Sequence, residues 1–215
     1  MRIIEYRRVP FVDREKEEKW LLERFSQEPE KILFIYGPKS SGKTTLMEYL
    51  VENVLKKDKS LYVNYVNFRG YAIVNYDSFL DVYFQPIEDE NKPFIEKALE
   101  YLPISIGRFG GNVSLPIKGI QFGLNIELYD RLVEKKIDPF NLLLEILKKI
   151  KRKQMPILIL DEIQTLQDIY MNGEIKKKHL LTEFFNFLVR LTKETHLAHV
   201  VVMTSETLFL EKIYN

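Results

Sequence analysis

Four apolar runs of strand length alternate along the chain with segments whose apolar residues recur at helical spacing. The predicted strands cover residues 31–36, 61–68, 156–161 and 199–204, and the predicted helices cover 13–25, 44–55, 77–84, 138–153 and 177–194. Asp13 and Asp77 are expected to cap two of the helices, because an aspartate side chain accepts hydrogen bonds from the free N–H groups at a helix start. The first strand is apolar throughout, as in a strand buried on both faces of a parallel sheet. Strands that alternate with helices predict a doubly wound α/β fold, here in one domain over residues 1–215.

The region 104–128 does not follow this pattern. It holds five glycines and alternating apolar residues such as Val113 and Leu115, without a helical period. Glycine-rich segments of this kind are typical of loops and hairpins. We therefore expect a hairpin-like or mobile insertion in this part of the domain.

The composition excludes several classes of protein. The chain has 215 residues, a formal net charge of +1 and no cysteine. Disulfide frameworks, thiolate metal sites and cysteine nucleophiles are therefore excluded, and no overall charge points to nucleic acid. The N-terminus lacks the apolar core of a signal peptide, and the longest apolar runs are too short to cross a bilayer. We expect a cytoplasmic protein that has no membrane partner.

Residues 37–44 match the complete Walker A pattern, Gly-x4-Gly-Lys-Thr, and lie between a predicted strand and a predicted helix, as this motif requires. The glycines allow backbone conformations that other residues avoid, so N–H groups of the loop and helix start can point at a phosphate. Lys43 is expected to neutralise charge on the β- and γ-phosphates, and the Thr44 hydroxyl to bind Mg²⁺. The predicted nucleotide-binding residues here are Gly37, Pro38, Lys39, Ser40, Ser41, Gly42, Lys43, Thr44 and Thr45.

A pair of acidic residues, Asp161 and Glu162, follows the predicted strand 156–161. In open α/β sheets, ligands bind at the carboxyl ends of the strands. Asp161 therefore matches a Walker B aspartate, which holds Mg²⁺, and Glu162 is placed to orient or deprotonate an attacking water. The alternative is that both acids simply cap the segment that follows.

The chain lacks the guanine-reading motif Asn-Lys-x-Asp of GTPases, because its nearest match, at Asn91, has no aspartate. This favours ATP as the nucleotide. A metabolite kinase shares the P-loop and stays open as an alternative, although we identify no arginine-bearing lid in the sequence.

With these motifs in order, the chain resembles the archaeal ATPase family, a branch of the STAND P-loop ATPases that are related to AAA+ proteins. The stretches that carry the resemblance are 11–15, 35–44, 65–69, 159–164 and 201–205. The resemblance implies a three-layer P-loop NTPase sandwich, with a mainly parallel sheet of the additional-strand type.

The resemblance also implies roles for residues outside the Walker motifs. Thr204 or Ser205, at the end of the fourth strand, fits the sensor 1 position, which contacts the γ-phosphate or the attacking water; we favour Ser205. An ordinary serine cap of the following helix is the alternative. Val12 and Arg14 lie in the N-terminal segment that contacts the adenine in such proteins.

The chain departs from the family after the sensor 1 position, where members normally continue into a fifth strand, a helical lid and a winged helix-turn-helix domain. In the usual strand order, the missing fifth strand would leave strand 31–36 at an edge, which invites pairing. We therefore expect either a chain cut short at its C-terminus or a protein completed by a partner chain.

The predicted function is binding of ATP with Mg²⁺ and ATP hydrolysis that drives a conformational switch. Glu162, Lys43 and Ser205 are the predicted catalytic residues, and Thr44 and Asp161 the predicted metal ligands. A nucleotide-binding scaffold or regulatory module that does not hydrolyse ATP is the main alternative, ahead of a metabolite kinase. The expected partners are the nucleotide and a protein partner or second copy, with DNA binding possible only through the missing winged-helix region.

Two further signals are interpreted as structural. His196 and His199 are three residues apart, but they straddle a helix-to-strand junction with no third ligand nearby. The basic runs at 148–153 and 176–178 are interpreted as solvated faces. The first run lies near a helix C-terminus, where cations interact favourably with the helix dipole.

Overall fold

A computed structural model of the chain describes residues 3–6, 9–84, 139–171 and 178–206. The predicted insertion at 104–128 and the first residues of the predicted helices 138–153 and 177–194 lie outside the described residues. The strands are β1 (Ile3–Tyr6), β2 (Val9–Val12), β3 (Ile32–Tyr36), β4 (Leu61–Asn67), β5 (Met155–Asp161), β6 (Tyr170–Met171), β7 (Lys178–His179) and β8 (His199–Thr204). The helices are α1 (Glu15–Phe25), α2 (Lys43–Asn53), α3 (Tyr76–Phe84), α6 (Pro139–Lys151) and α7 (Leu180–Val189), with short turns η1 (Leu55–Lys57), η2 (Phe68–Gly70), η3 (Ile163–Leu166) and η4 (Arg190–Glu194).

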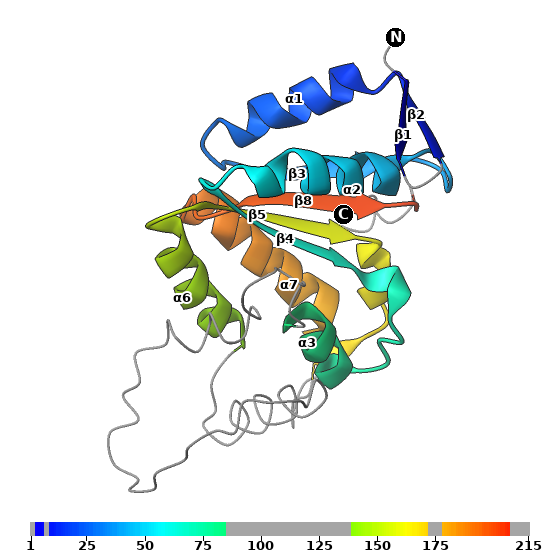
Figure 1. Ribbon diagram of the computed structural model, residues 1–215. Coiled ribbons are helices and arrows are strands. Elements are labelled where there is room, and N and C mark those ends of the chain that lie inside the picture. The colour runs from blue at the N-terminus through cyan, green and yellow to red at the C-terminus, as the bar shows by residue number, and fades with distance from the viewer. Residues whose placement is uncertain (1–2, 7–8, 85–138, 172–177, 207–215) are drawn as a thin grey trace, which may run out of the picture.

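The central sheet is parallel, with the strand order β3-β8-β5-β4 (Figure 1). This order confirms the predicted α/β fold, in which the fourth strand lies between the strands that carry the two Walker motifs. The register pairs Asn67 with Asp161, Asp161 with Met203, and Tyr36 with Thr204. All four strands therefore end at one edge of the sheet, which brings the residues that follow them together.

Helices cover both faces of the sheet and form a three-layer arrangement (Figure 1). Alternate residues of β5 point to opposite faces: Ile157 and Ile159 pack with α1 and α2, whereas Leu158 and Leu160 pack with α3, α6 and α7. Side chains of a strand alternate in this way because its repeat is two residues. Both faces are apolar, so β5 and β8 are buried almost throughout.

Strand β3 differs from the predicted fully buried strand. Within the described residues it lies at the edge of the sheet, next to β8 only, and its residues are half-buried or exposed. Tyr36 at its end is 59% exposed. Edge strands leave a row of backbone groups unpaired on one side.

Two predicted helix caps were wrong. Helix α1 begins at Glu15 after Arg14, without a side-chain cap, and Asp13 has a left-handed backbone with φ 58°. Helix α3 is capped two residues earlier than expected, because the Asn75 side chain accepts a hydrogen bond of 2.8 Å from the Ser78 N–H. Asp77 therefore lies inside the first turn, where its negative charge is favourable.

The hairpins β1–β2 and β6–β7 had no counterpart in the sequence prediction. Their strands are too short to show a clear alternation of apolar and polar residues. None of the described helices combines the length and apolar character that a membrane crossing requires.

Candidate active site

The P-loop connects β3 to α2 and forms a left-handed turn at the start of the helix. Ser40 has φ 64°, and Gly42, the N-cap of α2, has φ 84°. Glycine adopts the positive φ of position 42 without steric cost, which explains why a glycine directly precedes Lys43. The first turn of α2 then leaves N–H groups free at its N-terminus, where an anion is favoured.

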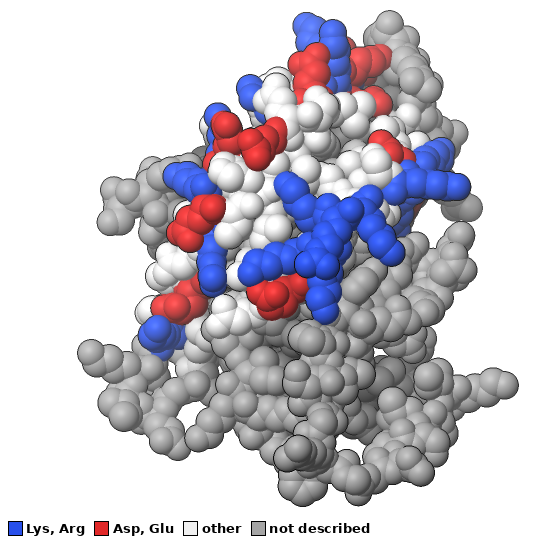
Figure 2. All heavy atoms as spheres, turned by 90° about the vertical axis from the view of Figure 1, so that its left-hand side faces the viewer, with Lys and Arg blue, Asp and Glu red and all other residues white. Residues whose placement is uncertain are grey.

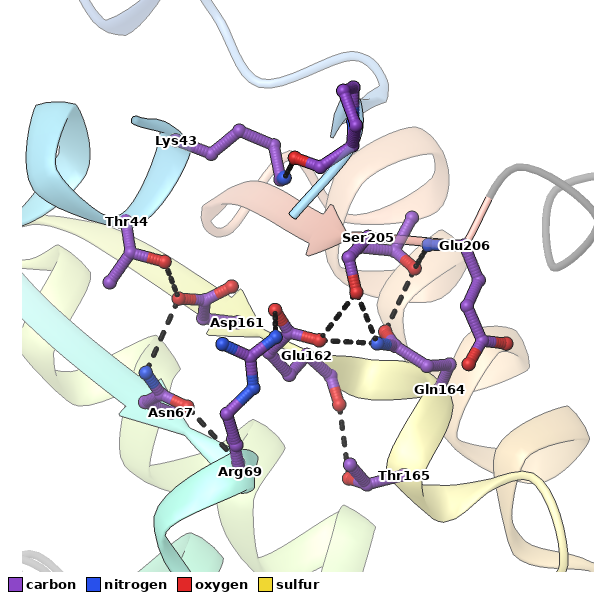
Figure 3. A network of polar contacts seen from close by, with 12 residues as sticks. Lys43, Thr44, Asn67, Arg69, Asp161, Glu162, Gln164, Thr165, Ser205 and Glu206 are labelled. Carbon is purple, nitrogen blue, oxygen red and sulfur yellow. Dashed lines mark hydrogen bonds and ion pairs between the residues drawn. The ribbon is translucent and has the colours of Figure 1, made fainter. Parts of the chain in front are cut away.

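The Lys43 ammonium group lies over this loop (Figure 3). Its Nζ donates hydrogen bonds to the carbonyl oxygens of Gly37 at 2.7 Å and Pro38 at 3.0 Å, and to the Ser41 Oγ at 3.3 Å. The positively charged Lys43 ammonium group therefore lies at the opening of the P-loop, beside the free N–H groups at the start of α2.

Asp161 ends β5 next to the P-loop helix, as the sequence predicts. Its Oδ2 accepts hydrogen bonds from the Thr44 hydroxyl at 2.8 Å, the Tyr65 hydroxyl at 3.2 Å and the Asn67 amide at 3.4 Å. Its Oδ1 is buried and has no hydrogen-bond partner. Burial raises the pKa of the Asp161 carboxyl, whereas the hydrogen bond from Thr44 lowers it.

These groups fit a Mg²⁺ ion. A buried carboxylate oxygen without a partner is costly unless a donor or a cation completes it, and the Thr44 hydroxyl lies beside the same carboxylate. Among the described residues, no group of three or more His, Cys, Asp or Glu side chains could hold a metal ion. Mg²⁺ does not need such a group, because it commonly uses one or two carboxylates together with substrate phosphates and water.

Glu162 directly follows Asp161 and has a left-handed backbone with φ 58°. Its side chain is 5% exposed and both of its oxygens are engaged (Figure 3). Oε1 is ion-paired with Arg69. Oε2 accepts hydrogen bonds from the Gln164 amide and, at 3.0 Å, from the Ser205 hydroxyl. The carboxylate is therefore fixed by residues from three strand ends.

The end of β8 joins this network through Gln164. The Thr204 hydroxyl donates to the Gln164 Oε1 at 2.8 Å, and the Gln164 amide nitrogen donates to the Ser205 Oγ at 3.3 Å. Ser205 thus contacts Glu162 directly, whereas Thr204 reaches it through Gln164. The Thr204 Oγ1 also accepts the backbone N–H of Glu206 at 3.1 Å. The helix that Ser205 would cap in the alternative interpretation lies outside the described residues.

Arg69 and Gln164 carry no predicted role, although both lie in stretches on which the family resemblance rests. A solvent-facing arginine after a strand and a glutamine after two acids give no distinctive sequence signal. Their contacts with Glu162 can be recognised only in the folded chain, because the parallel register aligns Asn67, Asp161 and Met203 at the same end of the sheet.

The N-terminal segment contacts the P-loop through Arg14. Its Nη2 donates to the Ser41 carbonyl oxygen at 2.8 Å and its Nη1 pairs with Glu17 at 2.7 Å. Val12 is the last residue of β2. The structure therefore places this segment beside the loop, while the predicted contacts of Val12 and Arg14 with a base stay predictions.

A pocket of about 220 Å³ unites these elements. It is lined by Lys39, Ser40, Ser41, Gly42, Lys43, Thr44, Thr45, Asn67, Arg69 and Glu162. Seven of the lining residues come from the P-loop and the helix start, and the other three come from the ends of β4 and β5. The pocket therefore joins a site for phosphate to a buried carboxylate.

The two histidines with metal-like spacing lie elsewhere. The His196 Nδ1 is 2.8 Å from the Pro29 carbonyl oxygen, and His199 is buried at the start of β8 with its ring edge against Phe25. They have separate contacts, in line with the structural interpretation.

Comparisons with known proteins agree with this geometry. The model of an ATPase domain found predominantly in Archaea matches residues 11–215. An uncharacterized ATP-binding protein of Methanocaldococcus jannaschii is 40% identical over 209 residues, covering 95% of this chain and 55% of that protein. Another from Pyrococcus horikoshii is 37% identical over 206 residues, covering 95% of this chain and 57% of that protein. The chain spans about half the length of these relatives.

The fold also matches a solved structure. A Walker-type ATPase of Pyrococcus abyssi superposes with a TM-score of 0.50 and 15% identity, over 99% of this chain and 50% of that one. At this identity the likeness concerns the fold alone. The family match over most of the sequence, the P-loop and the strand order lead to one conclusion: this chain belongs to the family of ATPase domains found predominantly in Archaea.

Proposed function

We propose that this chain binds ATP together with Mg²⁺ and hydrolyses it to drive a conformational switch. The observation that carries the proposal is the hydrogen bond of 2.8 Å between the Thr44 hydroxyl and Asp161, which joins residues 117 positions apart next to the P-loop. The buried, unpartnered Oδ1 of Asp161 supports a cation there. The names of the relatives support ATP as the nucleotide.

In this proposal the P-loop residues bind and orient the triphosphate. The N–H groups at the start of α2 face the β-phosphate, and the Lys43 ammonium exchanges loop carbonyls for phosphate oxygens. Thr44 and Asp161 would hold Mg²⁺, which when bound neutralises charge on the phosphates.

Glu162 is the proposed general base, because it is the carboxylate that lines the pocket beside the P-loop. A general base must reach the proton that it removes from the attacking water. In the described arrangement Arg69, Gln164 and Ser205 occupy its oxygens. Release of Arg69 frees Oε1 while the other two contacts keep the carboxylate in position.

A second candidate follows from the same contacts. With both oxygens engaged, Glu162 fits a module that binds ATP and does not hydrolyse it until another event breaks the Arg69 pair. In that case the bound nucleotide, rather than turnover, sets the conformation that a partner recognises.

Two variants test the proposal. Lys43→Ala is expected to weaken ATP binding at least tenfold, or about 1.4 kcal/mol, by calorimetry. Glu162→Gln is expected to keep ATP binding and to lose about 10²- to 10⁴-fold in phosphate release, the usual contribution of a general base. Unchanged turnover in Glu162→Gln overturns its assignment as the base. ATP binding by the unaltered chain without detectable phosphate release favours the second candidate.

A further inference from the structure

Two basic stretches that are distant in sequence, 56–59 before β4 and 149–153 before β5, meet at the end of the sheet opposite the P-loop. Their exposed or half-exposed cations are Lys56, Lys57, Lys59, Lys149, Arg152 and Lys153, which we call the basic surface. The first two belong to η1 after α2, Lys59 precedes β4, and the other three lie at the end of α6 and before β5. Figure 2 shows Lys and Arg side chains gathered on this side of the molecule.

The parallel register brings these stretches together. Leu61 of β4 pairs with Met155 of β5, so Lys59 and Lys153 each lie two residues before paired positions. The Gln154 side chain donates to the Lys59 carbonyl oxygen at 3.1 Å, and the Met155 N–H donates to the Ser60 carbonyl oxygen at 2.7 Å. Neighbouring strands are about 4.8 Å apart, which places the like charges of the two turns side by side.

The basic surface keeps a net positive charge, because the Asp58 carboxylate between Lys57 and Lys59 offsets only one of the six cations. In the part of the chain that the structure describes, no carboxylate is ion-paired with any of the six residues, whereas Lys148 on the same helix pairs with Glu145 at 2.6 Å. The Asp58 carboxylate in the same turn accepts hydrogen bonds from Ser60 instead. Because the whole chain has a formal net charge of only +1, six such cations leave the remainder net negative. The uneven distribution of charge produces a positive electrostatic field at the basic surface, which the net charge of the whole chain does not reveal.

The exposed side chains on and around the basic surface indicate which class of partner it binds. Protein interfaces centre on buried aromatic or apolar anchors, and surface helices on membranes insert an apolar face. Binding of single-stranded nucleic acid uses aromatic side chains as stacking platforms. Among the described residues, the exposed large hydrophobic side chains are Trp20, Tyr36, Tyr71, Val74 and Tyr170, and none belongs to the two basic stretches. A row of phosphates needs only cations, and lysines outside a groove contact phosphates without reading bases.

We propose that the basic surface binds the phosphate backbone of duplex DNA, independently of base sequence. Strands β4 and β5 run from this surface to Asn67 and Asp161 at the candidate active site, and each has seven residues. Seven residues of strand span about 23 Å. The duplex therefore binds without covering the P-loop, and both sites can be occupied at once.

Fluorescence anisotropy with a labelled 20-base-pair duplex of random sequence tests the proposal at 50–200 mM salt. Non-specific binding of this kind falls steeply with salt, by about 0.9 in log affinity per log salt for each phosphate neutralised. The chain is expected to bind in the micromolar range at the low-salt end with a slope of about four to six. Lys59→Ala/Lys153→Ala is expected to reduce the slope by about two and the affinity at least tenfold.

The matched control is Lys16→Ala/Lys19→Ala, which removes the same charge from exposed positions of α1. It is expected to leave duplex binding within a factor of about two of the unaltered chain. The proposal is overturned if both double variants lose the same duplex affinity, or if Lys59→Ala/Lys153→Ala leaves the salt slope unchanged. It is also overturned if the unaltered chain does not bind the duplex at 50 mM salt. Tighter binding to oligo-dT or to vesicles with anionic lipids than to the duplex also overturns it, in favour of those partners. The Lys59→Ala/Lys153→Ala variant should bind a non-hydrolysable ATP analogue as the unaltered chain does, so failure of this proposal is distinguishable from failure of the proposed nucleotide function.

Discussion

Arg69, two residues beyond the end of β4, is ion-paired with Glu162, the residue directly after β5. The two partners differ in their freedom to move. The Arg69 side chain is 55% exposed, whereas that of Glu162 is 5% exposed and has two other hydrogen-bond donors. If the pair opens, Arg69 is therefore the partner that moves, and it lines the same pocket as Lys43.

Arg69→Ala is expected to raise ATP turnover at saturating ATP by about two- to tenfold, or about 0.4–1.4 kcal/mol in the activation barrier. The reason is that the variant frees Oε1 of Glu162 to accept a proton while Gln164 and Ser205 still orient the carboxylate. ATP binding should weaken, because Arg69 also supplies positive charge to the pocket. Phosphate release measured over a range of ATP concentrations separates the two effects.

Arg152→Ala is the control for this variant, since it removes the same charge at the opposite end of the sheet. It should leave both parameters unchanged. A lower turnover of Arg69→Ala at saturating ATP would contradict a restraining role and would assign Arg69 to stabilisation of the transition state.

Gln164→Leu is expected to lower turnover about tenfold or more and to leave ATP affinity unchanged. Gln164 is buried and does not line the pocket, but it connects Thr204 to Glu162 and Ser205. We infer that it is a positioning residue for the proposed base. Leucine has a similar size and removes the hydrogen bonds, so steady-state turnover and equilibrium ATP binding should respond differently.

A double-mutant cycle with Thr204→Val tests whether Gln164 acts through the network. If it does, the double variant loses little more turnover than Gln164→Leu alone. Independent, additive losses in turnover, or a parallel loss of ATP binding, would show instead that Gln164 supports the fold of this region.

The sequence predicts the strands and their order better than the helix caps and the hydrogen bonds of the candidate site. The sequence predicts the strand 199–204 at its observed bounds, because a run of β-branched residues between polar ends is typical of a buried strand. The order of the four strands also followed from the resemblance. The caps at Asp13 and Asp77 failed because Asn75 competes for the same role and Asp13 adopts a left-handed backbone, and neither choice is encoded by residue type alone.

In the candidate site, too, some residues could be predicted from the sequence and others could not. Thr44 and Asp161 could be paired from the sequence, because each belongs to a motif with a fixed place at the strand ends. Arg69 and Gln164 could not, because their importance arises from the register that sets Asn67 beside Asp161 and Asp161 beside Met203. The meeting of the basic stretches around Lys59 and Lys153 has the same origin.

Thr44→Val should reduce the Mg²⁺-dependent part of ATP binding by about tenfold or more, whereas Thr44→Ser should retain most of it. Valine keeps the shape of threonine and removes the hydroxyl that lies 2.8 Å from Asp161. Serine keeps the hydroxyl and loses one methyl group. Calorimetric titration with ATP, in Mg²⁺ and in excess chelator, isolates the effect.

In chelator the three proteins should bind ATP alike, since the P-loop backbone and Lys43 are unchanged. Equal Mg²⁺ dependence in Thr44→Val and the unaltered chain would remove Thr44 from the proposed metal ligands.

His199 should make the fold less stable at mildly acidic pH. It is buried at the start of β8, its Nε2 has no hydrogen-bond partner, and its ring edge contacts Phe25. Burial first, and then the positive charge of Lys151, lower the pKa of His199 below its ordinary value of 6.5. Protonation in the folded state would bury a charged ring next to a cation and leave an N–H without an acceptor.

The sign of the pH effect follows from proton linkage. Between the lowered pKa of the folded state and about 6.5, the unfolded chain binds a proton at His199 that the folded chain does not, so the free energy of unfolding rises with pH. This stability is fully present above about pH 6.5 and is lost as the pH falls through the folded pKa, at up to about 1.4 kcal/mol per pH unit. Urea unfolding of the unaltered chain and of His199→Gln between pH 5 and 8 measures it. The two proteins differ only at position 199, so the difference between their curves isolates His199 and should shrink as the pH falls below 6.5. Parallel curves would show that His199 does not resist protonation in the folded state.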